Sequence, residues 1–356
     1  MSYKYANAIG SKPQKAFISR DETVMLQGIA VLLMVWHHLF GFPDRIFSPY
    51  IMVFDSIGNV ETLLSYFGRI CIAVFAFCSG YGMQVKAVPL QQKGMRVLLN
   101  SYSQAINRLG KFYQKYWLVF FSFVPLGFFL KVYSFQLLPF LKGILGMNSV
   151  YNAEWWYIVY YIQLILLFPV LNYLGSLLEI KCPILQHVFL IAFLLILSLL
   201  PATFAKYNFL LILCYFVEGM YLARINLFMW VYESLQFEWS RLVAGIVLLI
   251  AVFVLRTIGL PDYVLVPVFV FAVVMLLKNR MLLRLTGSLL RLTGKYSTYI
   301  WLTHTFFAYY YFQNLTYTPK YSWLIAAFCI ALCICCGMIL ELLAALPGKT
   351  CRFCRK

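Results

Sequence analysis

The chain has 356 residues, of which 63% are hydrophobic, 19% aromatic and only 12% charged. Ordinary soluble domains carry about 25% charged residues, so this composition excludes a soluble globular protein. The formal net charge of +17 comes from cations spread over the segments between apolar stretches, without the clustered basic face of a nucleic-acid-binding protein. The sequence therefore predicts an all-α, polytopic transmembrane bundle.

Apolar stretches close to the roughly 20 residues needed to cross a bilayer recur along the whole chain. Gly, Pro, Asn or charged residues bound each of them. The segment at 137–147 is too short and too broken by Pro and Gly to cross, so it predicts a re-entrant or interfacial piece. We predict about ten crossings, at 23–42, 63–83, 115–133, 153–173, 185–205, 207–223, 241–258, 261–277, 294–313 and 322–343.

An even number of crossings places both termini on one side of the membrane. Most of the 29 Lys and Arg fall on that side, which predicts that it is cytoplasmic. We expect a basic cytoplasmic segment at 1–22, a transmembrane domain at 23–343 and a basic cytoplasmic tail at 344–356. Two predicted cytoplasmic loops, 84–115 and 278–295, hold several cations and no acidic residue, which also suits a phosphorylated ligand.

Most of the ten cysteines lie inside predicted crossings, where Cys behaves as a small hydrophobic side chain. Cys351 and Cys354 have the C-x-x-C spacing but lack a second pair, so we interpret them as free thiols in the tail. We expect no metal site and no tightly bound cofactor.

His38 follows an apolar run inside the first predicted crossing, and an ionisable residue in a membrane is a candidate functional residue. Helical spacing places Gln27, Val31, Met34 and His38 on one stripe. A neutral imidazole accepts a proton from a hydroxyl near neutral pH, as acyl transfer requires. The alternative is a structural hydrogen bond to a neighbouring helix, and that interpretation is favoured for His37.

Arg69 shares a predicted stripe with the small residues Ala73, Ala76 and Gly80, which predicts a buried guanidinium facing protein. There it could stabilise an oxyanion, whereas the alternative is a cation at the outer interface that reaches lipid headgroups.

Glu154, Trp155 and Trp156 begin the fourth predicted crossing on its outer side, where they form either an aromatic belt or a sugar-binding group. His304 ends a stripe near the middle of the ninth crossing. It is a second acid–base group, an acceptor contact or a structural partner.

Four segments carry a resemblance when taken in order: 25–40 around His38, 75–82 with its Ser79-Gly80 pair, 154–157, and 297–304 ending in His304. Together they resemble the Acyltransferase 3 family of integral-membrane acyltransferases. The resemblance implies transfer of an acyl group, commonly acetyl, from cytosolic acyl-coenzyme A to a hydroxyl of an extracytoplasmic glycan or lipid-linked sugar at the cell membrane. It also implies that the first-helix His, here His38, is essential.

The family carries a basic residue eleven positions before that His, where this chain has Gln27. The alternatives are therefore a catalytically inactive member of the family, or a multi-pass transporter or flippase for a glycolipid, although the two halves of the chain show no convincing repeat. Our candidate residues are His38 and Arg69 for catalysis, Arg20, Gln27, Arg108 and Lys111 for the acyl donor, and Glu154, Trp155, Trp156 and His304 for the acceptor.

Overall fold

A computed structural model describes residues 16–87, 95–181 and 209–353 of the chain. Within these ranges the elements are helices and turns, without a β-strand, which confirms the all-helical prediction. A single isolated bridge joins Ile51 and Tyr321. The helices are α1 (Arg20–Phe40), α2 (Val60–Phe67), α3 (Cys71–Lys86), α4 (Met95–Phe129), α5 (Leu137–Ile144), α6 (Trp156–Lys181), α9 (Phe209–Ile225), α10 (Leu227–Ser234), α11 (Glu238–Thr257), α12 (Asp262–Leu277), α13 (Arg280–Lys295), α14 (Ser297–Thr305), α15 (Gln313–Thr316) and α16 (Ser322–Phe353).

Five helical stretches in the described ranges are long and apolar enough to cross a membrane, and the number rises to seven if two bent helix pairs each form one span. The structure therefore does not confirm ten crossings. The predicted crossing at 185–205 lies outside the described residues. The predicted crossing at 294–313 is divided between α14 and a π-helical turn at Phe306–Tyr310. The five stretches are Arg20–Phe40, Val60–Lys86, Ala153–Leu177, Glu238–Thr257 and Ser322–Ala345.

The predictions of loops at 84–115 and 278–295 are wrong, because most of each segment is helical. α4 begins at Met95 and continues for 35 residues, so its polar first half and its apolar second half form one helix. Residues 280–295 form α13, which bends away from α12 by 109°. In α13 the apolar side chains recur at helical spacing between the cations, the pattern of an amphipathic helix. The predictions gave weight to the charge of these segments and not to that spacing.

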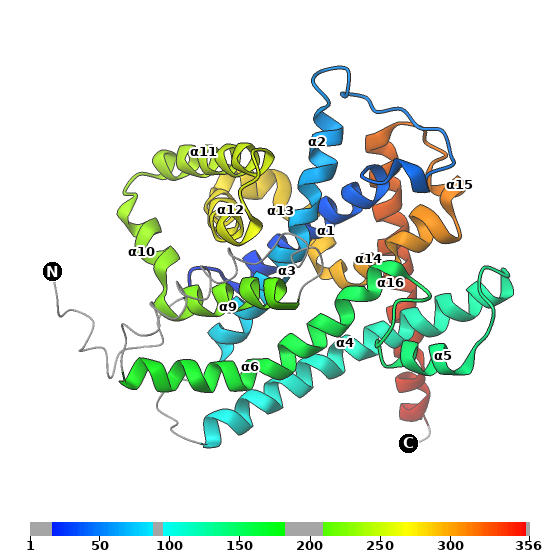
Figure 1. Cartoon of the computed structure of the whole chain (residues 1–356), viewed down its shortest axis with the longest axis horizontal. Helices are drawn as coiled ribbons and strands as arrows, with labels where there is room; N and C mark the ends of the chain where they lie inside the picture. The colour runs from blue at the N-terminus through cyan, green and yellow to red at the C-terminus, as the bar shows by residue number, and fades with distance from the viewer. Residues whose placement is uncertain (1–15, 88–94, 182–208, 354–356) are drawn as a thin grey trace.

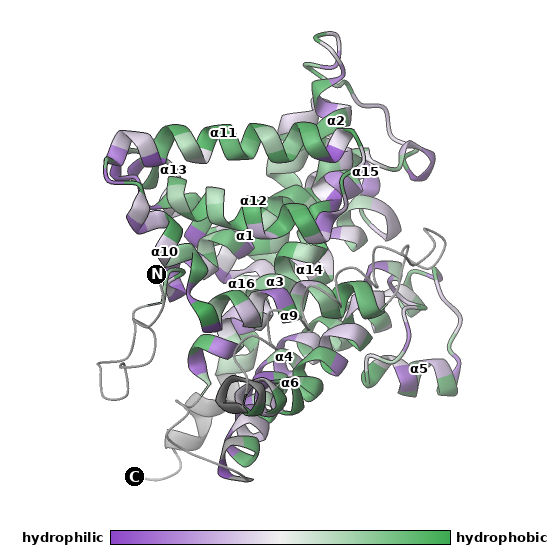
Figure 2. Cartoon of the chain, turned by 60° about the vertical axis from the view of Figure 1, so that its left-hand side comes forward, coloured by the Kyte–Doolittle hydropathy of each residue, from purple (hydrophilic) through white to green (hydrophobic). Residues whose placement is uncertain are grey.

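Figure 1 shows how the helices surround the site. α4 and α6 lie side by side along the lower edge, and α1 and α3 lie above them. α11 and α12 form a second packed pair on the other side of α1. In Figure 2, hydrophobic residues cover most of α11 and α12, and hydrophilic residues gather near the ends of these helices. The apolar side chains of α11 are mostly exposed or half-buried, as on a helix that faces lipid, whereas those of α12 are mostly buried within the bundle.

α3 and α9 pack with their backbones in contact, because a glycine occupies the contact on each helix. A Cβ atom added to Gly80 of α3 would lie 1.9 Å from the carbonyl oxygen of Phe216. A Cβ added to Gly219 of α9 would lie 2.2 Å from the carbonyl oxygen of Phe77. Small residues allow such close approach between membrane helices, so this pair sets the position of α3.

Gly80→Ala is expected to destabilise the protein, because its methyl group would push against the backbone of α9. Overpacking of this kind costs about 1–3 kcal/mol. Thermal unfolding in detergent should show a lower midpoint for Gly80→Ala than for the unmodified chain. Gly82→Ala is the matched control on the same helix, since no atom lies within 4 Å of its added Cβ. Equal midpoints for the two variants would contradict this packing.

Candidate active site

A cavity of about 490 Å³ lies among α1, α3, α4, α6 and α14. His38 and Glu154 line one part of it, which we name the His38 end. Gln27 and Arg108 line another part, which we name the Arg108 end. Gln27 and His38 are eleven residues apart on α1, so the two ends are separated by about 16 Å along this helix. Polar groups thus occur at both ends of a cavity inside an apolar bundle.

One stripe of α1 forms a wall of the cavity. Gln27, Met34 and His38 line it, whereas Val31 from the same predicted stripe is fully buried in the core. The 3₁₀ turn Ala153–Trp155 and the start of α6 form another wall, where Glu154, Tyr157 and Tyr161 recur at helical spacing and all line the cavity.

His38 contacts three groups from three different parts of the chain. Its Nε2 atom lies 3.1 Å from Oε2 of Glu154. Its Nδ1 atom lies 3.0 Å from the carbonyl oxygen of Met34 and 3.0 Å from Nε2 of His304. His38 is 8% exposed and His304 is fully buried. The imidazole is therefore held on both ring nitrogens, with its Nε2 side directed to the carboxylate.

The hydrogen-bond partners determine where the protons lie. Nδ1 of His304 lies 3.0 Å from the carbonyl oxygen of Ile300 and 2.8 Å from that of Trp301. Carbonyl oxygens only accept, so this nitrogen carries a proton and Nε2 of a neutral His304 accepts from Nδ1 of His38. Nε2 of His38 and the carboxylate of Glu154 are then both acceptors unless they share one proton. Nε2 of His38 is therefore the ring nitrogen that faces both the carboxylate and the cavity.

Arg45 connects this pair to the surface. Its Nη1 atom lies 3.3 Å from Oε1 of Glu154, and its guanidinium lies 4.2 Å from the ring centre of Phe42. The Arg45 side chain is 41% exposed, compared with 14% for Glu154. Tyr309, in the π-helical turn, donates a hydrogen bond to the carbonyl oxygen of His38. The carboxylate of Glu154 thus has a second cationic partner on the exposed side.

The Arg108 end is built around a guanidinium held by two hydroxyl groups. Nε of Arg108 donates to the hydroxyl of Tyr161 and its Nη2 donates to Oγ of Ser79, both at 3.0 Å. These contacts join α4, α6 and α3. Because Gln27 of α1 lines the same end, a cation and an amide are available there to an anionic or carbonyl-bearing ligand.

A family model described as an acyltransferase domain matches residues 25–342, which is nearly the whole chain. The chain belongs to the Acyltransferase 3 family. No curated protein and no solved structure is significantly similar to it. Membership supports a membrane protein with acyltransferase activity, and the four sequence segments that carried the resemblance lie within the matched residues.

The position of Arg69 differs from the one predicted from the sequence. Arg69 lies in a 3₁₀ turn, Gly68–Ile70, between α2 and α3 within the helical stretch Val60–Lys86. Its side chain is exposed and not buried, although it borders the cavity. The prediction of a buried guanidinium on a continuous helix is therefore wrong, because the stripe of small residues begins only after this turn.

Four other predicted residues divide between the cavity and the rest of the bundle. Arg20 and Lys111 are exposed and do not line the cavity. Trp155 is 1% exposed, and its indole donates to the carbonyl oxygen of Leu302 at 3.1 Å. Trp156 lines the cavity. Trp155 thus has a packing role in the structure, whereas Trp156 forms part of the cavity wall.

Four residues at the cavity were not among the site residues predicted from the sequence: Arg45, Ser79, Tyr157 and Tyr161. The spacing of Tyr157 and Tyr161 from Glu154 was the available signal, since positions three and seven residues further share a helix face. Arg45 and Ser79 offered no such signal, because their partners lie on other helices.

His304→Leu should lower the turnover number for acyl transfer by about tenfold or more, because Nδ1 of His38 loses an acceptor. His304→Gln should retain more activity, since its amide oxygen can accept the same hydrogen bond. Steady-state kinetics of the two purified variants test this. Equal turnover numbers for His304→Leu and His304→Gln would show that His304 acts only as a packed side chain.

Proposed function

We propose that this protein transfers an acyl group, acetyl in the simplest case, from cytosolic acyl-coenzyme A to a hydroxyl of an extracytoplasmic glycan or lipid-linked sugar at the cell membrane. One observation carries the proposal: a single cavity joins a buried His–Glu pair to an anchored guanidinium. Acyl transfer needs an acid–base group at the reacting carbon and a binding site for an anionic carrier, and the two ends supply them.

The Arg108 end suits the donor. Coenzyme A carries phosphates, and Arg108 is a guanidinium already oriented by Ser79 and Tyr161. In the predicted topology this end faces the cytoplasm, where the donor is made. The acyl thioester would extend along Gln27 and Met34 toward His38.

The His38 end suits the acceptor. Trp156 and Phe42 line it with aromatic surface, and Arg45 adds an exposed cation. Aromatic faces pack on the apolar sides of sugar rings, while charged groups hydrogen-bond the hydroxyls. The predicted topology places this end toward the outer side, where a glycan acceptor is found.

The reaction uses Nε2 of a neutral His38 as its base. An acceptor hydroxyl takes the place of Glu154 at Nε2 of His38, and the carboxylate stays paired with Arg45. His38 removes the hydroxyl proton as the oxygen attacks the thioester carbonyl carbon. The resulting imidazolium is stabilised by the nearby carboxylate of Glu154. The C–S bond then breaks, the same proton passes to sulfur, and an ester and coenzyme A thiol leave.

His38→Gln should lower acyl transfer by at least about a hundredfold, because the amide cannot accept and return a proton. The assay uses purified protein in nanodiscs, labelled acetyl-coenzyme A and a panel of methyl glycosides, and it follows label in the glycoside together with release of the thiol. A carrier would transport its ligand and consume no thioester.

Gly82→Ala provides the control for this assay, since its added methyl group meets no atom within 4 Å. It should retain the activity of the unmodified chain. The thermal midpoint of His38→Gln should stay near that of the unmodified chain, which separates loss of chemistry from loss of fold. Unchanged acyl transfer by His38→Gln would contradict the proposed function.

Arg108→Met should raise the KM for acetyl-coenzyme A by about tenfold and change the turnover number less, because it removes a charge from binding and leaves His38 in place. Lys142→Met is a control that removes one exposed cation from α5, outside the cavity. It should leave KM unchanged. An equal KM for both variants would exclude Arg108 from donor binding.

A further inference from the structure

Tyr157 carries a buried hydroxyl that has no hydrogen-bond partner in the described part of the chain. The residue is 7% exposed and lies in the first turn of α6. It also lines the cavity. A buried polar group without a partner is unfavourable, so a bound molecule that supplies an acceptor would satisfy it.

The position of Tyr157 is intermediate between the two ends of the cavity. It precedes Tyr161 by four residues on the same face of α6, and it follows Glu154, in the 3₁₀ turn that leads into α6, by three. Neighbours at such spacings have Cβ atoms about 5–6 Å apart. Glu154 contacts His38 and Tyr161 contacts Arg108. The hydroxyl between them therefore lies where a ligand held at the Arg108 end would approach the acid–base pair.

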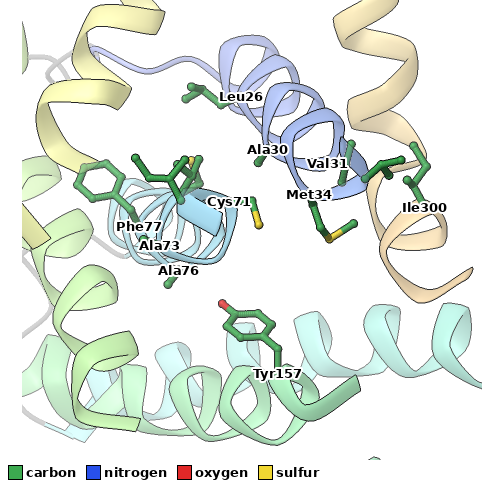
Figure 3. Packing of buried hydrophobic residues seen from close by; sticks show 14 of the residues in the cluster. Leu26, Ala30, Val31, Met34, Cys71, Ala73, Ala76, Phe77, Tyr157 and Ile300 are labelled. Atoms are coloured by element: carbon green, nitrogen blue, oxygen red, sulfur yellow. The ribbon is translucent and has the colours of Figure 1, made fainter. Parts of the chain in front are cut away.

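The direction of the hydroxyl is set by packing. Figure 3 shows it pointing from α6 toward α3, on the side where Cys71 and Ala76 are labelled, and Cys71 also lines the cavity. The ring packs edge-on against Trp301 and Trp156, with centroid distances of 5.6 Å and 5.9 Å. Sulfur atoms are only weak acceptors, so the lining nearest to the hydroxyl leaves its proton available to a ligand.

We propose that Tyr157 is a catalytic residue whose hydroxyl donates a hydrogen bond to the carbonyl oxygen of the acyl thioester; this inference rests on the proposed acyl transfer. The acceptor oxygen forms its bond to the carbonyl carbon of the thioester. As it does so, the C=O electron pair moves to the carbonyl oxygen, which becomes an oxyanion. Tyr157 stabilises this charge and keeps its own proton. When the C=O bond re-forms, the C–S electron pair leaves with sulfur, which takes the proton held by His38.

A donor already oriented toward the developing charge is effective, because it needs no rearrangement during the reaction. Arg69 was our candidate for this role, but its side chain is exposed and belongs to the turn before α3. Tyr157 is buried beside the reacting pair and has its hydroxyl free. The structure thus favours a neutral donor over a cation.

Tyr157→Phe tests the inference, because it removes the hydroxyl and keeps the ring. The turnover number for transfer from acetyl-coenzyme A to the methyl glycosides should fall by about a hundredfold, while the KM for the donor stays within about twofold. The thermal midpoint should be unchanged or higher, since an unpaired buried hydroxyl is lost. A hydroxyl that served only the fold would instead lower the midpoint and leave turnover intact.

Two variants on the same helix complete the experiment. Tyr160→Phe removes a hydroxyl outside the cavity and should keep the original turnover. Tyr161→Phe removes a hydrogen-bond partner of Arg108. It should raise the KM for the donor more than it lowers the turnover number.

The outcomes separate this inference from the proposed function. If the unmodified chain transfers acetyl, His38→Gln does not, and Tyr157→Phe keeps its turnover, the role of Tyr157 is overturned alone. If the unmodified chain consumes no thioester, the proposed function fails and the role of Tyr157 falls with it. A selective loss of turnover in Tyr157→Phe supports both.

Discussion

The contact between Nε2 of His38 and the carboxylate of Glu154 is the interaction on which the rest of the site depends. In an apolar bundle an unpaired charge or polar atom is costly, so both partners must find all their contacts within the protein. His38 finds them in Met34 and His304, and Glu154 finds its second contact in Arg45. These groups come from distant parts of the chain, so the pair forms only when α1, α6 and α14 are packed in register.

Close packing between α3 and α9 extends this dependence to the other end of the cavity. Gly80 places α3 against the backbone of α9, and the preceding residue, Ser79, contacts Arg108. Successive residues on a helix point in different directions, so the Ser-Gly pair serves two contacts at once. The distance between α3 and α9 therefore influences where Ser79 can hold the guanidinium. Helix packing and the proposed donor site are linked through two adjacent positions.

Features that depend on one helix could be predicted from the sequence, whereas features that depend on two or more could not. The stripe of Gln27, Met34 and His38 follows from the helical period alone, and all three line the cavity. Periodicity also predicted the helical class of the fold. It does not say which stripes face each other, so the contact between His304 and His38 and the anchoring of Arg108 required coordinates.

The predictions that failed gave charge too much weight. Cations at 84–115 suggested a loop, yet these residues continue into an apolar helix, because α-helices accommodate long charged side chains as easily as apolar ones. Arg69 failed for a different reason. A 3₁₀ turn at that residue changes the helical period within the stretch Val60–Lys86, and nothing in the local composition except Gly68 marks the change. Tyr157 was not predicted as a site residue, because an aromatic belt at the membrane interface already explains a tyrosine beside two tryptophans.

Gln27 stands where the family has a basic residue, and this departure raised the possibility of an inactive protein. The geometry offers a different explanation under the proposed function. Electrostatic stabilisation of an anionic donor depends on where a cation lies and not on which helix supplies it. Arg108 of α4 lines the same end of the cavity as Gln27. Two guanidinium or ammonium groups in that confined, partly apolar space would repel each other, so a cation supplied by α4 favours an uncharged residue on α1. The amide of Gln27 still offers a donor and an acceptor to the carrier. The cavity thus holds a cation, Arg108, although α1 has an uncharged residue at Gln27.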